Sequence, residues 1–360
     1  MRVAVVGAGA IGGMVGGKLA LSGCDVTLIA RGAHLAALQR DGLHLEMTPA
    51  DGGKLHVPSI AATDDIAAAG PHDVVILALK AHQIAAVARA MPALYGPETV
   101  VLTMQNGIPW WYFQRHGGPF DGRRLDCLDP DGLLTVNIPA QRIIGCIAYP
   151  AATIAAPGVI RQVEGNRFPV GELDGSDSPR VRQVSAMLEG AGFKSRVLTD
   201  IRSEIWLKAW GNLAFNPISA MTHATLEDMC RFAPTRTLAQ MMMEEAQAVA
   251  TKLGITFRVG IDRRIAGAEA VGAHKTSMLQ DVESGRELET EALVGAVAEL
   301  ARLTDTRTPH IDAVLACTRL LGETLRRSGG TVQLAASPPA AAARSAKPAG
   351  EAPATCPMHR

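Results

Sequence analysis

One stretch of the chain carries polar side chains at the spacing of a helical turn. Lys208, Asn212 and Asn216 follow one another at steps of four, so a helix would place them along one face. An ammonium and two amides all donate hydrogen bonds to oxygen, which suits a small molecule that bears a carboxylate and a carbonyl. A surface ion pair between Glu204 and Lys208 is the alternative interpretation. Because Pro217 disfavours helical geometry at the residue before it, we expect the helix to end or kink at Asn216.

The amino-terminal residues contain a glycine pattern typical of dinucleotide binding. Gly7, Gly9 and Gly12 form G-x-G-x-x-G between a predicted strand and a predicted helix. Gly7 permits a tight turn, Gly9 lets the backbone approach a pyrophosphate, and Gly12 lets strand and helix pack closely. The free N–H groups at the helix start favour phosphate. We therefore assign cofactor binding to Gly7, Gly9, Ala10, Ile11 and Gly12, with a ligand-free close turn as the alternative.

The end of the next predicted strand indicates which dinucleotide is bound. An NAD-binding domain usually holds an acidic residue there, which accepts the ribose hydroxyls. Here Arg31 stands at that place, and its planar, permanently charged guanidinium suits a 2′-phosphate. The sequence therefore favours NADPH over NADH, with a solvated surface arginine as the alternative.

Two further polar residues follow predicted strands. Lys80 comes directly after the strand predicted at 74–79, and Asn106 comes shortly after the strand predicted at 100–103. Ligands of open α/β sheets bind at the carboxyl ends of the strands, so both side chains are expected at one crevice. Ordinary polar caps would explain the same positions.

The elements that must position these residues divide the chain into two regions with different hydrophobic patterns. Over the first hundred residues, β-branched runs alternate with alanine-rich helical patterns, which indicates βαβ units and a parallel sheet. From about residue 202 onward, long amphipathic helical patterns replace the strands. The fold class is therefore an α/β amino-terminal Rossmann domain, with a mainly parallel sheet, followed by an all-helical carboxy-terminal domain. The predicted strands are 3–6, 26–29, 74–79, 100–103, 143–149, 159–163 and 167–171, and the clearest helices are 238–253 and 288–303.

The expected domain boundaries follow from these differences in pattern and composition. Residues 1–199 form the Rossmann domain, with a loop insertion at about 109–139 that is rich in Gly, Pro, Asp and Arg and is expected to run over the surface. Residues 200–328 form the helical domain. Residues 329–360 are mostly Ala, Pro and Ser, a composition that buries too little apolar surface to order a chain, so a disordered tail is predicted.

Composition excludes several classes of partner. The 360 residues hold 35 basic and 35 acidic side chains, so no long-range field favours nucleic acid or an anionic membrane. No apolar run reaches the roughly 18 residues of a membrane span, and the amino terminus does not resemble a secretory signal. Six scattered cysteines indicate neither a metal site nor a disulfide framework. We expect a cytoplasmic protein with a small-molecule partner; a homodimer is compatible with the sequence.

Five motifs in the same order resemble those of the ketopantoate reductase (2-dehydropantoate 2-reductase) family. They are GAGAIG, ALKAHQ, MQNG, WLKAWGNLAFNP and TSMLQDVESGRELETEAL, spread over residues 1 to about 325. The resemblance implies NADPH-dependent reduction of 2-dehydropantoate to pantoate, on the route to pantothenate and coenzyme A. It also implies a Rossmann domain joined to an all-helical domain.

The same resemblance implies roles for individual residues. Lys208 would be the general acid, and Glu289 would support the substrate or the lysine. An ammonium suits this task because hydride transfer to a keto carbon leaves negative charge on the carbonyl oxygen. The implied contacts are Asn106, Asn212, Asn216 and Ser277 for the substrate, and Lys80 and Asn106 for the cofactor.

One segment departs from the family pattern. The insertion at 109–139 is longer than the compact connection expected of a pantoate-forming enzyme, and it begins with four aromatic residues at 110–113. These aromatics could line a larger pocket, form a lid, or pack as core at the domain junction. Two other functions therefore stay open: an NADP-dependent reductase of a different 2-oxo or 3-oxo acid, and a non-catalytic NADPH-binding sensor.

Overall fold

The β-branched runs of the amino-terminal half form one seven-stranded sheet. The computed structural model describes residues 1–330, and its strand order in this sheet is β11-β8-β7-β6-β1-β2-β5. Neighbouring strands run parallel except β11, which pairs antiparallel with β8. The prediction of a mainly parallel sheet is thus confirmed. The strands are β1 (Arg2–Val6), β2 (Asp25–Ile29), β5 (Ala61–Thr63), β6 (His72–Leu77), β7 (Tyr95–Thr103), β8 (Ile143–Cys146) and β11 (Val170–Glu172).

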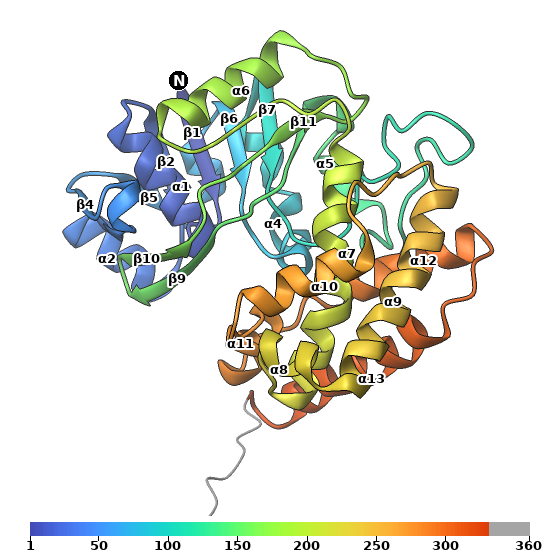
Figure 1. Ribbon diagram of the computed structural model, residues 1–360. Helices are drawn as coiled ribbons and strands as arrows, with labels where there is room; N and C mark the ends of the chain where they lie inside the picture. Colours follow the sequence, from blue (N-terminus) through green and yellow to red (C-terminus); the bar gives the residue numbers. More distant parts are fainter. Residues whose placement is uncertain (331–360) are drawn as a thin grey trace, which may run out of the picture.

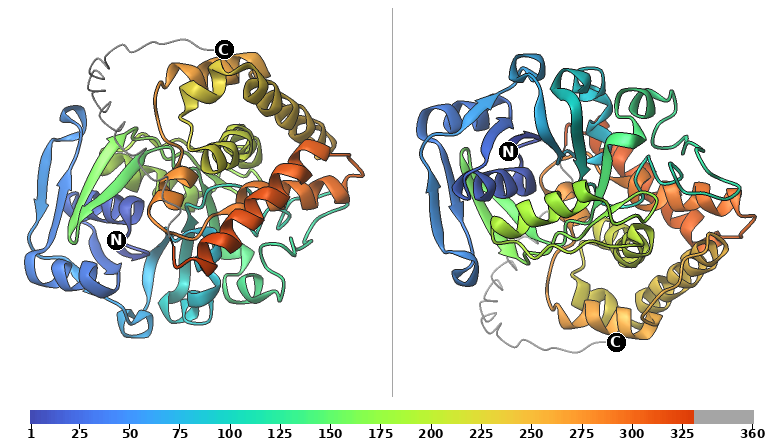
Figure 2. Two further views of the ribbon diagram at one scale, coloured as in Figure 1. Left: turned by 90° about the horizontal axis from the view of Figure 1, so that it is seen from below. Right: turned by 90° about the horizontal axis from the view of Figure 1, so that it is seen from above.

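A second, four-stranded sheet packs on helix α1 (Ala10–Leu21), as Figure 2 shows. Small residues make this arrangement possible. A Cβ at Gly16 would stand 2.6 Å from Leu28 of the large sheet, and one at Gly17 would stand 2.7 Å from Leu43 of the small sheet. Helix α1 therefore lies close to both sheets at once. The second sheet has the order β4 (Lys54–Val57), β3 (Leu43–Glu46), β10 (Val159–Glu164) and β9 (Ala151–Ala156).

Short helices connect the strands of this half. They are α2 (Gly32–Asp41), α3 (Ile66–Ala69), α4 (Ala85–Ala88), α5 (Leu133–Asn137) and α6 (Pro179–Gly190), with 3₁₀ turns η1 (Pro49–Asp51), η2 (Ala81–Gln83), η3 (Met91–Leu94) and η4 (Ala140–Arg142). The longest of them, α6, begins at an N-cap serine whose hydroxyl accepts a hydrogen bond from a backbone N–H of the first turn.

The carboxy-terminal half is helical, as predicted. Its central helix, α7, extends from the sheet into the helical half (Figure 1), and the neighbouring helices α9, α11 and α13 pack around it. Two tryptophans of α7, Trp206 and Trp210, are fully buried in this core. The helices are α7 (Ile201–Thr222), α8 (Leu226–Arg231), α9 (Ala233–Lys252), α10 (Ile261–Ala270), α11 (Ser277–Glu283), α12 (Ala296–Leu303) and α13 (Pro309–Arg327), with a π-helical turn η5 (Glu291–Gly295) before α12.

The helix does not end at Asn216, and the Asn216 side chain is buried, so the prediction of a helix end with an exposed amide there is wrong. Helix α7 continues through Pro217 to Thr222. Proline removes one backbone donor from a helix and crowds the preceding turn, which disfavours this conformation locally. The residues on both sides, Phe215 and Ile218, are buried in the core, and burying such side chains typically contributes about 1.5–3 kcal/mol each. Packing therefore outweighs the local preference.

The aromatic start of the insertion is core, which corrects the prediction of a surface loop for this part. Trp110, Trp111, Tyr112 and Phe113 are all almost completely buried. The Trp111 indole donates to Thr103 of β7 at 3.1 Å, and the Trp206 indole of α7 donates to the Tyr112 hydroxyl at 2.8 Å. Of the three interpretations, packing at the junction of the two halves is the one that these contacts support.

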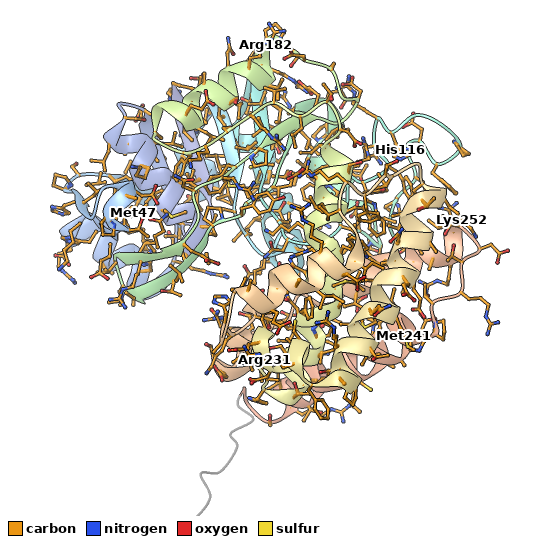
Figure 3. All side chains as sticks on the ribbon, viewed as in Figure 1. Met47, His116, Arg182, Arg231, Met241 and Lys252 are labelled. Carbon is orange, nitrogen blue, oxygen red and sulfur yellow. The ribbon has the colours of Figure 1, made fainter. Side chains whose placement is uncertain are left out.

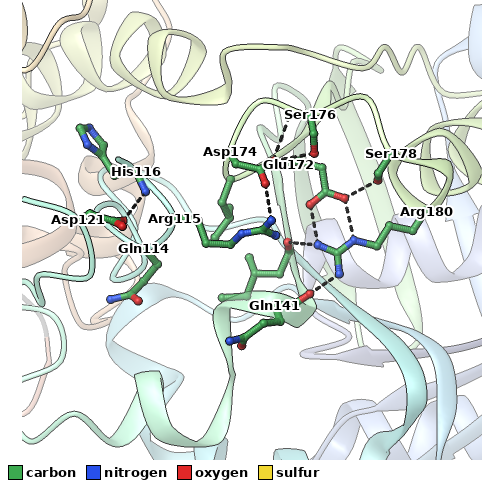
Figure 4. A network of polar contacts seen from close by, with 12 residues as sticks. Gln114, Arg115, His116, Asp121, Gln141, Glu172, Asp174, Ser176, Ser178 and Arg180 are labelled. Carbon is green, nitrogen blue, oxygen red and sulfur yellow. Dashed lines mark hydrogen bonds and ion pairs between the residues drawn. The ribbon is translucent and has the colours of Figure 1, made fainter. Parts of the chain in front are cut away.

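Residues 114–124 of the insertion are exposed or half-buried, as predicted for a surface loop, whereas Leu125, Asp129, Leu134 and Ile138 farther along it are buried. Arg115 pairs with Asp174, and nearby Glu172 accepts two parallel hydrogen bonds from Arg180 at 2.7 and 2.6 Å (Figure 4). In Figure 3, His116 of this segment lies on the opposite side of the molecule from the small sheet. The Arg115–Asp174 ion pair therefore links this segment to the loop that follows β11.

Within residues 1–330, no helix is long and apolar enough to cross a membrane. The tail predicted to be disordered lies outside the described residues, apart from 329 and 330.

Candidate active site

The carboxyl ends of four neighbouring strands bring the predicted cofactor residues together. Gly7 follows β1, Arg31 follows β2, Lys80 follows β6, and Asn106 follows β7. Strand β1 lies between β6 and β2, so the chain order reverses at this point of the sheet. Ligands of open α/β sheets bind at such a switch point.

The glycine turn has the geometry that a pyrophosphate requires. Gly7 adopts φ +96°, which favours glycine, and a Cβ at Gly12 would stand 2.1 Å from the Gly7 carbonyl oxygen. A Cβ at Gly9 would meet nothing within 4 Å, so the backbone is open on that side. Helix α1 starts at Ala10, followed by Ile11, without a side-chain cap, which leaves N–H groups of its first turn free. These features fit a bound dinucleotide.

Arg31 stands where the sequence predicted it, at the end of β2. It is exposed and forms the N-cap position of α2, and within residues 1–330 no ion pair or hydrogen bond engages its guanidinium. A cation beside the glycine turn is therefore available to an anionic ligand.

The Lys208 side chain reaches from the helical half to the sheet. Its Nζ donates to Asn106 Oδ1 at 2.6 Å and to the carbonyl oxygen of Ala148, just beyond β8. The alternative ion pair with Glu204 does not form. Glu204 instead accepts hydrogen bonds from the Tyr149 hydroxyl at 2.5 Å and from Arg258 at 2.7 Å.

Burial changes the acidity of Lys208. Loss of hydration disfavours the charged ammonium and lowers the pKa of Lys208 to about 8, while the nearby Glu289 carboxylate opposes this shift. A lysine with such a pKa holds its proton at neutral pH and releases it readily, as a general acid must.

Glu289 lies in the loop directly before the helical turn η5, so the helix predicted at 288–303 begins slightly later than expected. The side chain is buried, and its Oε1 accepts a hydrogen bond from the Ala81 N–H at 3.3 Å. Burial raises the pKa of Glu289, and the charge of Lys80 opposes that rise. The carboxyl group therefore faces the junction of the two halves.

Lys80 also contacts the helical half. Its Nζ lies 2.5 Å from Asp281 Oδ2, and the other oxygen of Asp281 accepts from Arg286 at 2.9 Å. Asp281 is buried, and it was not singled out from the sequence although it lies in one of the family motifs. Lys80 is thus held by a buried acid of the helical half.

The remaining predicted residues continue along α7. The Asn216 amide donates to the Ser277 hydroxyl at 3.2 Å, and Ser277 is exposed at the start of α11. Asn212 is half-buried, and its side-chain amide has no hydrogen-bond partner among residues 1–330. The structure therefore places Lys208, Asn212 and Asn216 on one helix with Ser277 beside its far end.

Comparison with known proteins identifies the family of the chain. The family models "Ketopantoate reductase PanE/ApbA" and "Ketopantoate reductase PanE/ApbA C terminal" match residues 3–175 and 200–322. The chain belongs to the ketopantoate reductase family. It is 50% identical to the 2-dehydropantoate 2-reductase of Mesorhizobium japonicum over 322 residues, which cover 89% of this chain and 98% of that protein.

Solved structures of the ketopantoate reductase family share this architecture. The crystal structure of a protein assigned as a ketopantoate reductase from Ralstonia solanacearum MolK2 has a TM-score of 0.84 at 39% identity, covering 90% of this chain and 98% of that one. The 2-dehydropantoate 2-reductase from Geobacter metallireducens has a TM-score of 0.77 at 25% identity, covering 90% and 99%. The predicted Rossmann and helical fold class is therefore confirmed.

Proposed function

We propose that this ketopantoate reductase family member reduces 2-dehydropantoate to pantoate with NADPH, a step toward pantothenate and coenzyme A. The observation that carries the proposal is the Lys208 ammonium, held by Asn106 at the carboxyl end of β7. The proposed proton donor of the helical half thus lies at the edge of the sheet where the nucleotide would bind.

The residues of the chain supply what the reduction needs besides hydride. NADPH provides the hydride when it is bound at the glycine turn. Lys208 stabilises the negative charge that develops on the keto oxygen and donates its proton to that oxygen. Glu289 favours the protonated lysine through its charge. The substrate contacts belong to Asn106, Asn212, Asn216 and Ser277.

The proposed cofactor contacts follow the strand ends. The turn from Gly7 to Gly12 receives the pyrophosphate, because the Gly9 side is open and α1 begins there. Arg31 receives the 2′-phosphate, since its guanidinium is exposed at the end of β2. Lys80 and Asn106 would hold the nicotinamide end.

One assay tests this function directly. Purified protein is incubated with NADPH and 2-dehydropantoate, and then with a panel of other 2-oxo and 3-oxo acids, while NADPH absorbance is followed. We expect the highest kcat/KM for 2-dehydropantoate. A higher kcat/KM for another oxo acid would identify that acid as the preferred substrate. NADPH binding without any turnover would instead favour a non-catalytic NADPH-binding sensor.

Replacing the lysine tests the proton donor. Lys208→Ala is expected to lower kcat by at least about 100-fold, the lower end of the usual contribution of general acid catalysis. NADPH affinity, measured by fluorescence titration, should stay unchanged because the pyrophosphate turn is intact. Full activity of this variant would remove Lys208 from the mechanism.

Two further properties stay predictions. A homodimer is tested by light scattering on the purified chain, and a cytoplasmic location is tested by fractionation of the producing cell.

A further inference from the structure

The residue before Asn106 connects the ends of two neighbouring strands. Gln105 follows β7, which pairs with β6 in the large sheet (Figure 1). Its Nε2 donates hydrogen bonds to the carbonyl oxygen of Leu77, the last residue of β6, at 2.7 Å and to that of Leu79 at 3.2 Å. The loop that carries Asn106 is thus fastened to the strand that leads to Lys80.

The other side of Asn106 is fastened to the helical half. Gly107 adopts φ +79°, and a Cβ there would stand 2.2 Å from the carbonyl oxygen of Ala292 in η5. The same oxygen accepts a hydrogen bond from the Ile108 N–H at 2.9 Å. Asn106 Oδ1, which accepts from the Lys208 ammonium at 2.6 Å, is therefore presented by a backbone that is fixed on both sides.

The oxygen of the Gln105 amide has a defined direction as well. Leu77 and Leu79 offer only carbonyl oxygens to this amide, so Nε2 must point at them and Oε1 must point away. Oε1 is buried, and no donor among residues 1–330 binds it. Gln105 and Lys208 both line one small cavity of about 10 Å³. A partial negative charge beside this space favours the charged form of the lysine.

We propose that Gln105 is a positioning residue that holds Asn106 and, through Asn106, keeps the Lys208 ammonium directed for proton transfer. The proposal rests on the function proposed above, in which Lys208 is the general acid. Gln105 itself contacts neither substrate nor cofactor in this proposal. A misplaced proton donor slows the chemical step even when both substrates still bind, so the loss of Gln105 should appear in kcat.

The experiment removes the amide and keeps the length of the side chain. Gln105→Met should lower kcat by about 10-fold, the order expected when one net hydrogen bond no longer positions a reacting group. NADPH affinity, measured by fluorescence titration, should stay within about threefold of the native value. The alkaline fall of kcat/KM should begin at a lower pH, because the charged lysine loses a well-placed acceptor. Gln105→His, which retains one ring N–H donor, should recover part of kcat.

A double-mutant cycle with Asn106→Ala distinguishes positioning from an independent effect. If Gln105 acts through Asn106, Gln105→Met should lower kcat by less than about twofold once residue 106 is already alanine. Additive losses would overturn the proposal, and so would a native kcat with a native pH profile in Gln105→Met. Both Gln105 variants enter the cycle, so the histidine variant carries the test if the methionine variant does not fold.

Gln39→Met is the matched control. The Gln39 amide also donates to a strand carbonyl, that of Ala62 at 3.0 Å, but Ala62 belongs to the edge strand β5. This variant should leave kcat and the pH profile unchanged. The pKa of Lys208 is also measured without turnover, from the ¹³C signal of its Cε, which is assigned by its loss in Lys208→Ala.

These readouts distinguish failure of this inference from failure of the proposed function. Native protein that reduces no oxo acid removes the proposed function together with the inference. An active enzyme in which Gln105→Met changes neither kcat nor the pKa of Lys208 removes the inference alone.

Discussion

At the scale of single residues, Lys208 and Glu289 set the pH dependence. The proton donor must carry its proton, and the pKa of Lys208 is about 8, so kcat/KM should fall as the pH rises through about 8. The Glu289 carboxylate raises this pKa. Glu289→Gln removes that charge, so the fall should begin at a lower pH. A pH–rate profile of both proteins checks the shift, and an identical midpoint would contradict the coupling of these two residues.

The preference between NADPH and NADH is also set by one residue. Arg31→Ala should weaken NADPH binding by about tenfold or more, the usual consequence of losing charge-assisted hydrogen bonds, while NADH binding changes little. Fluorescence titration with both nucleotides measures the two affinities. Arg40→Ala is the matched control, because Arg40 is an exposed arginine of α2 that pairs with its neighbour Asp41. Equal losses for NADPH and NADH would refute recognition of the 2′-phosphate by Arg31.

At the scale of the elements, the absence of a side chain at Gly211 lets α10 approach α7 closely. Gly211→Ala places a methyl group where the Arg264 guanidinium lies, and the flexible arginine must move away. Alanine also favours a helix over glycine by about 1 kcal/mol, so the thermal midpoint should not fall. Thermal unfolding followed by circular dichroism measures the midpoint of both proteins. A clear fall would show that the arginine cannot move aside without a loss of packing.

The helices and strands also show which features of the fold can be predicted from sequence patterns. The parallel sheet, the glycine turn and the helix of Lys208 were predictable because hydrophobic period and spacing are local signals. The passage of α7 through Pro217 and the burial of Trp111 were not, since both depend on packing between segments distant in the chain. The role of Asp281 had no local signal either, because its partner Lys80 is 201 residues away.

At the scale of the whole molecule, the ion pair between Lys80 and Asp281 joins the sheet to the helical half. Asp281 is buried and also accepts a hydrogen bond from Arg286, so its carboxylate is the common partner of two cations. Asp281→Asn keeps the volume but removes the charge, which leaves the half-buried Lys80 ammonium without its counter-ion. We expect the free energy of unfolding to fall by roughly 1–3 kcal/mol, the usual cost of an unpaired polar or charged group.

Urea denaturation followed by tryptophan fluorescence measures this loss, since the buried tryptophans lie in the core that the two halves share. Glu283→Gln on the same helix is the control: Glu283 pairs with Lys275 at 2.8 Å, but both side chains are substantially exposed. Exposed ion pairs contribute at most about 1 kcal/mol, so this variant should unfold close to the native midpoint. Because the Lys80 pair connects the strand end beside the nucleotide turn to α11, Asp281→Asn should also loosen the two halves relative to each other and raise the KM for the oxo acid. Equal stability of Asp281→Asn and Glu283→Gln would show that the two halves are held together by their apolar contacts alone.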